Sequence, residues 1–154
     1  MSLSFLYYLL MLFSLSTGNT EQLDKKPLSY LGSVQIFYFY DSRLPSAIGE
    51  TMNGLTQDLL DKQYADLVAN GDIVFHQIDL ASPIGQRVAQ KCNITMTGLV
   101  LSRHTRLVNL TQNGYAYAKS DPLAFQQNLA FHINRLLPSS LRPVEKEKTE
   151  QKEE

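Results

Sequence analysis

Residues 34–40 read VQIFYFY, an aromatic and β-branched run with apolar residues at both parities. A strand that is covered on both faces requires this pattern, so we expect a central strand here. The next residues, Asp41-Ser42-Arg43-Leu44-Pro45, break the strand. Pro45 suits the first turn of a following helix, because that position donates no intrahelical hydrogen bond. The stretch therefore predicts a strand, a short loop and a helix at the start of the domain.

An apolar stripe continues from this loop. Its members recur at intervals of four, three and four residues: Ile48, Met52, Leu55 and Leu59. That spacing is typical of one face of a helix. Tyr64, Leu67 and Val68 extend the stripe towards the Asn70-Gly71 turn signal, while glycines at 49 and 54 weaken the helix interior.

The rest of the domain alternates in the same way. Residues 73–78 predict a second strand, and Ser82-Pro83 begins a short helix with Ile84, Val88 and Cys92 on one stripe. Residues 99–101 and 107–110 predict an antiparallel hairpin, and Asn113-Gly114 predicts a turn. Asp121-Pro122 caps a last helix, which ends at Pro138 and has an apolar face: Phe125, Leu129, Ile133 and Leu136. The order β-α-β-α-β-β-α predicts an α/β, thioredoxin-like fold with a central mixed sheet flanked by helices.

The chain ends differ in composition from this body. Residues 1–18 carry no charged side chain and predict a signal peptide, with an uncleaved anchor or a buried helix as alternatives. We therefore expect an exported protein, periplasmic or extracellular, that meets the membrane only transiently through this segment. Residues 19–33 form a polar lead-in, 34–137 the domain, and 138–154 a charged tail that we predict to be disordered, or else to dock on a partner.

Composition excludes several classes of protein. The 154 residues include 14 basic and 15 acidic side chains, so bulk charge gives no reason to expect a nucleic-acid partner. The single cysteine excludes an intrachain disulfide and a Cys-rich zinc module. His76, His104 and His132 lack metal-ligand spacing, so we expect no metal and no cofactor. Ser42 and Ser46 lack the G-x-S-x-G pattern of a hydrolase nucleophile.

The residues also resemble a known family. The similarity rests on the 37–40 aromatics, the proline after Leu44, the 109–119 run, and Pro122, Phe125, Leu129 and Ile133. Over residues 34–137 the chain resembles the ArsF-type thioredoxin-like proteins of bacteria. The resemblance implies a Cys-x-x-Cys at the junction of the first strand and first helix. Here the four positions are Leu44, Pro45, Ser46 and Ala47.

Loss of both sulfurs removes dithiol chemistry. The first cysteine of such a motif is a thiolate held at a helix N-terminus, and the second resolves the mixed disulfide. Leu44 cannot ionise and Ala47 cannot resolve. The superfamily also places a cis-proline before the hairpin, where this chain has Thr97-Gly98-Leu99.

Three hypotheses for function remain. The first is a redox-inactive binding module that holds a protein or peptide at Leu44, Pro45, Thr97 and Gly98. The second is a one-thiol redox or thiol-transfer protein that uses Cys92, although packing in the core, or an intermolecular disulfide, also accounts for this residue. The third is a purely structural relative.

Minor motifs have simpler interpretations. Asn93-Ile94-Thr95 and Asn109-Leu110-Thr111 fit the N-glycosylation pattern, which we attribute to chance because the resemblance is bacterial and Asn109 falls in a predicted strand. Asp79 predicts a turn cap. Arg103, His104 and Arg106 predict a basic hairpin tip, either solvated or bound to a partner carboxylate.

Overall fold

The structure, a computed structural model, describes residues 32–143. The predicted signal peptide, the lead-in up to residue 31 and the charged tail from residue 144 lie outside the described residues. Within the described range, no helix combines the length and apolar character needed to cross a membrane.

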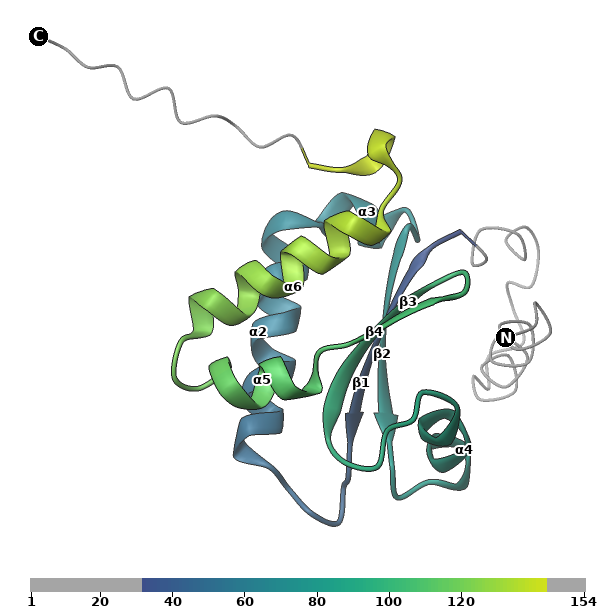
Figure 1. Cartoon of the computed structure of the whole chain (residues 1–154), viewed down its shortest axis with the longest axis vertical. Helices are drawn as coiled ribbons and strands as arrows, with labels where there is room; N and C mark the ends of the chain where they lie inside the picture. Colours follow the sequence, from purple (N-terminus) through teal and green to yellow (C-terminus); the bar gives the residue numbers. More distant parts are fainter. Residues whose placement is uncertain (1–31, 144–154) are drawn as a thin grey trace, which may run out of the picture.

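A four-stranded mixed sheet forms the centre of the domain (Figure 1). Its strands are β1 (Val34–Tyr40), β2 (Ile73–Asp79), β3 (Gly98–Arg103) and β4 (Arg106–Asn109). They lie in the order β2-β1-β3-β4, with β1 parallel to β2 and antiparallel to β3, and with β3 antiparallel to β4. The predicted parallel crossover and hairpin are both confirmed. This is a thioredoxin-like fold.

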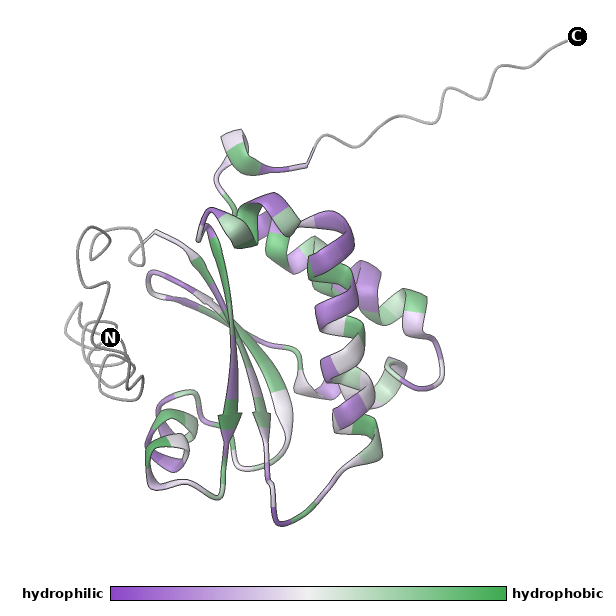
Figure 2. Ribbon diagram, turned by 180° about the vertical axis from the view of Figure 1, so that it is seen from behind, coloured by the Kyte–Doolittle hydropathy of each residue, from purple (hydrophilic) through white to green (hydrophobic). Residues whose placement is uncertain are grey.

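Helices cover both faces of the sheet (Figure 1). On one face lie α2 (Ala47–Gln63), α5 (Thr111–Tyr117) and α6 (Pro122–Leu136), and on the other lies α4 (Pro83–Lys91). The short α3 (Ala65–Ala69) follows α2. Two clusters of buried side chains result, one on each face of the sheet. Figure 2 shows hydrophobic residues along the strands that these two layers enclose.

Local signals in the sequence begin the helices. The Ser46 hydroxyl accepts from the Gly49 N–H at 3.1 Å, and the Ser82 hydroxyl accepts from the Gly85 N–H at 2.9 Å. The Asp121 carboxylate accepts from the Ala124 N–H at 3.0 Å. Each bond satisfies an amide that the first helical turn leaves without an intrahelical acceptor. Pro45 precedes the first cap, so it lies in the loop rather than in the predicted first turn of the helix.

The structure corrects the turn predicted at Asn113-Gly114. Both residues lie inside α5, where Gly114 allows a close approach between helices and forms no turn. A Cβ at Gly114 would overlap the Met52 sulfur, so the missing side chain lets α5 pack against α2.

Two other boundaries and the exposure of one side chain differ from the predictions. The apolar stripe after the first loop is divided at Tyr64, where α2 ends and α3 begins. Ile84, predicted to face the core, is 38% exposed. A 3-10 helix at Ser139–Leu141 extends the ordered chain beyond Pro138, and Leu141 packs against the larger core cluster, which gives this part of the predicted disordered tail an apolar anchor.

Candidate functional site

The loop that follows β1 is folded by its own polar contacts. The Leu44 N–H donates to the Asp41 carbonyl at 3.0 Å, which closes a turn. The Asp41 carboxylate accepts from the Arg43 guanidinium at 2.9 and 2.8 Å and from the Arg43 N–H at 3.0 Å. These bonds from Arg43 lower the pKa of Asp41 to about 2. The turn presents the Leu44 side chain, 70% exposed, to solvent.

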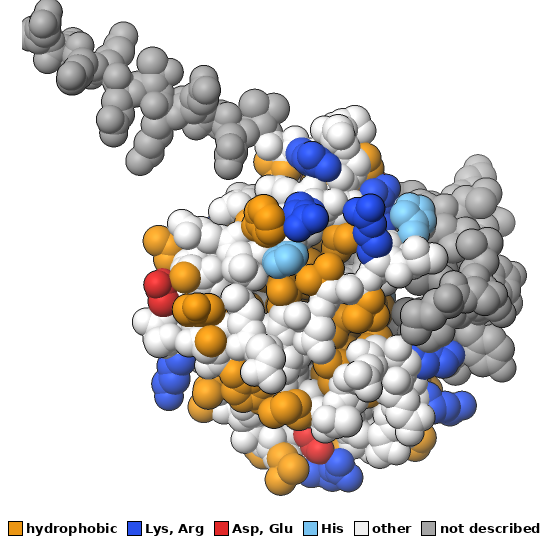
Figure 3. All heavy atoms as spheres, viewed as in Figure 1, with side chains coloured by type: hydrophobic (Ala, Val, Ile, Leu, Met, Phe, Trp, Pro, Cys, Tyr) orange, Lys and Arg blue, Asp and Glu red, His pale blue; other side chains and the backbone are white. Residues whose placement is uncertain are grey.

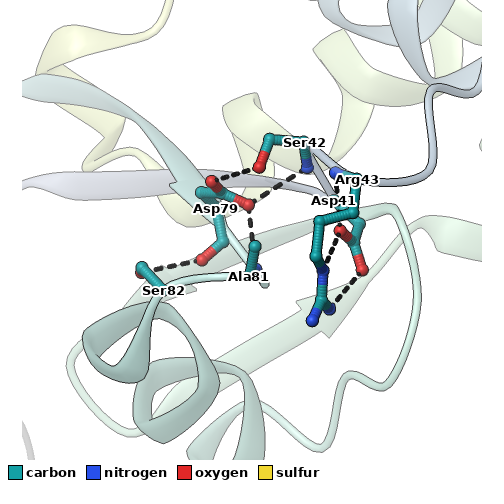
Figure 4. A network of polar contacts seen from close by, with 6 residues as sticks. All are labelled: Asp41, Ser42, Arg43, Asp79, Ala81 and Ser82. Atoms are coloured by element: carbon teal, nitrogen blue, oxygen red, sulfur yellow. Dashed lines mark hydrogen bonds and ion pairs between the residues drawn. The ribbon is translucent and has the colours of Figure 1, made fainter.

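Asp79 ties this loop to the end of β2 (Figure 4). Its carboxylate accepts from the Ser42 hydroxyl at 2.7 Å, from the Ser42 N–H at 3.2 Å and from the Ala81 N–H at 2.8 Å. The bond from Ala81 confirms the predicted turn cap. It is the largest cause of a lowered pKa at Asp79, followed by the Ser42 hydroxyl. The loops after the two parallel strands are therefore held together by one ionised side chain.

A pocket of about 380 Å³ lies where the first loop meets the start of α2. Its apolar wall is Leu44 and Pro45, its aromatic wall is Tyr38 and Tyr40, and Asp41 and Glu50 contribute carboxylates. Thr97, from the segment before β3, completes the lining together with polar side chains of α2 and β2. Of the residues predicted for binding, Leu44, Pro45 and Thr97 line this pocket. Gly98 does not line it and packs against Thr111 instead.

The aromatic wall comes from one face of β1. The Tyr38 and Tyr40 rings stack with centroids 6.0 Å apart and planes tilted by 14°. Burial, and then the Glu50 carboxylate, raise the pKa of Tyr38 to about 12. Its hydroxyl is therefore neutral at physiological pH and can both donate and accept a hydrogen bond.

Gly49 allows three segments to meet at the pocket. A Cβ at this position would lie 2.6 Å from the Thr97 Cγ2 atom and 3.0 Å from the Tyr38 hydroxyl. Contacts this short would push the helix away from the sheet. Gly49 therefore serves close packing, although in the sequence it only weakens the helix.

The positions that the family resemblance assigns to sulfur lie at the start of α2. Leu44 and Pro45 are in the loop, Ser46 is the N-cap, and Ala47 is the first helical residue. None of these side chains can form a thiolate or a disulfide, so the dithiol reaction is chemically impossible there. Thr97 lies beside the first turn of the same helix, and no cis peptide bond occurs among residues 32–143.

Cys92 lies on the opposite side of the sheet. It caps the end of α4, is 3% exposed, and belongs to the buried cluster that contains Phe37, Val88 and Ile94. Burial raises the pKa of its thiol to about 11. A neutral thiol inside the core is a poor nucleophile and offers no access to a partner disulfide. The burial of Cys92 therefore weighs against the one-thiol hypothesis, which requires an accessible Cys92.

The histidines occupy separate environments. His76, on β2, stacks on Phe37 with centroids 5.1 Å apart, and its Nε2 lies 2.6 Å from the Gln35 side-chain oxygen. His104 is exposed at the hairpin tip, and His132 contacts Phe131 on α6. Within residues 32–143, no three His, Cys, Asp or Glu side chains come together as metal ligands.

The basic hairpin tip has a structural component. The Arg103 guanidinium donates to the Gly32 carbonyl and to the Leu136 carbonyl, both at 2.7 Å. It therefore ties the hairpin to the end of α6 and is not simply solvated as expected. Figure 3 shows several basic side chains near the top of this face, with others spread along its left, right and lower edges.

Comparisons with known proteins give little beyond these observations. No protein-family model and no functionally described protein matches the chain. Among solved structures it is similar to one described as a malarial protein, with 12% identity, a TM-score of 0.43, and coverage of 63% of this chain and 97% of that one. It is also similar to mitochondrial thioredoxin 3 of Saccharomyces cerevisiae, with 20% identity, a TM-score of 0.37, and coverage of 53% and 67%. The fold assignment rests on strand order and direction.

Sequence reasoning missed Tyr38, Tyr40 and Glu50 as lining residues. Tyr38 and Tyr40 are two positions apart in a strand, so their side chains share a face, and this signal was present in the sequence. Glu50 falls in the first turn of the helix that follows the loop, which also placed it near Leu44. That these residues and Thr97 enclose one pocket depends on tertiary contacts, for which the sequence had no such signal.

Proposed function

We propose that this protein is an exported thioredoxin-like binding module that has no dithiol chemistry and holds an extended segment of a partner protein. The pocket at the β1–α2 junction carries the proposal, because it occupies the place where the resemblance implies a redox site and contains no sulfur. Its kinship with the ArsF-type proteins is part of the same proposal and rests on the sequence resemblance alone.

The pocket suits a peptide better than a reaction. Its volume of about 380 Å³ is at the lower end of typical ligand sites, enough for one or two side chains. Leu44 lines the pocket and is 70% exposed, so it gives an apolar contact at the rim. The loop that carries Leu44 is fixed by Asp41 and Asp79, so little ordering entropy is lost when a partner binds.

Peptide selection tests the proposal directly. A library of random peptides is panned against the full chain, and enriched peptides are measured by fluorescence anisotropy. Leu44→Asp should weaken these peptides at least about tenfold, because burying a Leu side chain contributes roughly 1.5–3 kcal/mol. The control is Leu123→Asp, which changes an equally apolar side chain, 64% exposed, outside the pocket lining.

Any of three results would overturn the proposal. One is the absence of any peptide that binds the full chain in solution. Another is equal weakening by Leu44→Asp and Leu123→Asp, with both variants folded by circular dichroism. Catalytic reduction of insulin disulfides by the wild-type chain would also contradict it, since no thiol is present at the start of α2.

A further inference from the structure

The charge of the pocket is one-sided. Its lining includes the carboxylates of Asp41 and Glu50 and no Lys, Arg or His side chain. Arg43, the adjacent cation, is held by Asp41 at 2.8 Å. A third carboxylate, Asp79, is bonded to the lining residue Ser42. Arg43 pairs with Asp41 and Lys62 pairs with Asp58, so neither of these two cations is paired with Glu50.

The hydroxyl of Tyr38 also belongs to this place. The Tyr38 side chain as a whole is only 5% exposed, and it lies on the aromatic wall that lines the pocket. It lines the pocket and lies beside Gly49 in the first turn of α2. A neutral tyrosine hydroxyl can accept a hydrogen bond as well as donate one. The pocket thus offers a hydrogen-bond acceptor on its aromatic wall.

We propose that the pocket selects peptides that present a lysine or arginine side chain to Glu50 and Tyr38. This inference rests on the proposed function and specifies its ligand class. A cationic head supplies several N–H donors, which match a carboxylate and a hydroxyl oxygen. The stacked faces of Tyr38 and Tyr40 add cation–π attraction, and the aliphatic stem packs on Leu44 and Pro45 at the rim.

The helix N-terminus beneath the pocket does not favour an anion instead. The Ser46 hydroxyl already accepts from the Gly49 N–H, and the Glu50 N–H donates to the Ser46 carbonyl at 2.8 Å. The Glu50 carboxylate also offsets the positive end of the helix dipole. An incoming carboxylate or phosphate would meet Asp41 and Glu50 and find no free cation among the lining residues.

The test uses enriched peptides in matched charged and neutral forms. Each arginine is replaced by citrulline, which keeps the shape and loses the charge, and each lysine by norleucine. At low ionic strength we expect the charged peptides to bind at least about tenfold more tightly than their neutral forms. Raising the salt to about 0.3 M should weaken the charged peptides several-fold relative to their own affinity at low salt.

Variants locate the charge that is responsible. Glu50→Gln should weaken the arginine peptide about tenfold and change the citrulline peptide less than about twofold. Tyr38→Phe removes only the hydroxyl and should weaken the arginine peptide about threefold to tenfold. The control is Asp61→Asn, an exposed carboxylate further along α2 and outside the lining, which should leave both affinities unchanged.

The outcomes separate this inference from the proposed function. Peptides that depend on Leu44 but bind equally in charged and neutral forms would overturn the inference and leave the binding module intact. Equal effects of Glu50→Gln and Asp61→Asn would also overturn it, because Glu50 would then act only as a first-turn residue of the helix. Failure of every peptide to bind would overturn both.

Discussion

The protection of Cys92 separates a binding module from a thiol enzyme. This side chain is 3% exposed and packs in the cluster between α4 and the sheet. The perturbation is therefore mild: the native chain is treated with a disulfide reagent that reports each reacted thiol by its absorbance. Because the chain has one cysteine, the signal reports Cys92 alone.

The ionisation of the thiol sets a lower bound on its protection. Burial raises the pKa of Cys92 from 9.0 to about 11. Near pH 8 the thiolate fraction therefore falls by about a hundredfold, since each pKa unit is a factor of ten. Burial protects the thiol further, because the reagent reaches the sulfur only when the end of α4 opens locally. We expect native Cys92 to react at least about a hundredfold more slowly than the same residue in urea.

A matched exposed thiol calibrates the rate. In a Cys92→Ala background, Gln90→Cys places a thiol two residues earlier, at an exposed position of α4. That thiol should react at nearly the rate measured in urea. Native Cys92 reacting within about tenfold of this reference would refute the reasoning and restore the one-thiol hypothesis.

Two further predictions concern stability. Gly85→Ala should lower the free energy of unfolding by about 2 kcal/mol, since its Cβ would overlap the Asp79 carbonyl, whereas Gly54→Ala, with open space at its Cβ, should raise it by about 0.5–1 kcal/mol. Urea titration measures both changes, and a change of the same sign in the two variants would contradict the close approach at Gly85. Burial lowers the pKa of His76 from 6.5 to about 4, so the unfolded chain binds the extra proton between these values and stability falls as pH falls through that window. The loss from about pH 7 to 4.5 should be about 2–3 kcal/mol, and His76→Phe should flatten it; an unchanged pH profile would show that His76 does not titrate between the two states.

Local patterns predicted most of the fold. The two-sided apolar run at residues 34–40, the second strand at 73–78 and the hairpin all correspond to observed strands. Ser82-Pro83 and Asp121-Pro122 begin helices as expected, because capping depends on residues within one turn. The prediction failed where a glycine serves a distant contact, as at Gly114, which gives α5 access to Met52.

The candidate site also has some features that the sequence determines and others that depend on tertiary contacts. By itself the sequence determined that no sulfur stands at the start of α2, and it placed Leu44 and Pro45 in an exposed loop. The expected site already included Thr97. Only the tertiary structure decided that Tyr38 joins Leu44 and Thr97 at one pocket, since this depends on the close approach of three segments that Gly49 permits. It also decided that Cys92 is buried, because helical spacing predicts a face but not what covers it. Periodicity is a local property of the chain, whereas a pocket is formed by surfaces from distant segments that fail to fill the space between them.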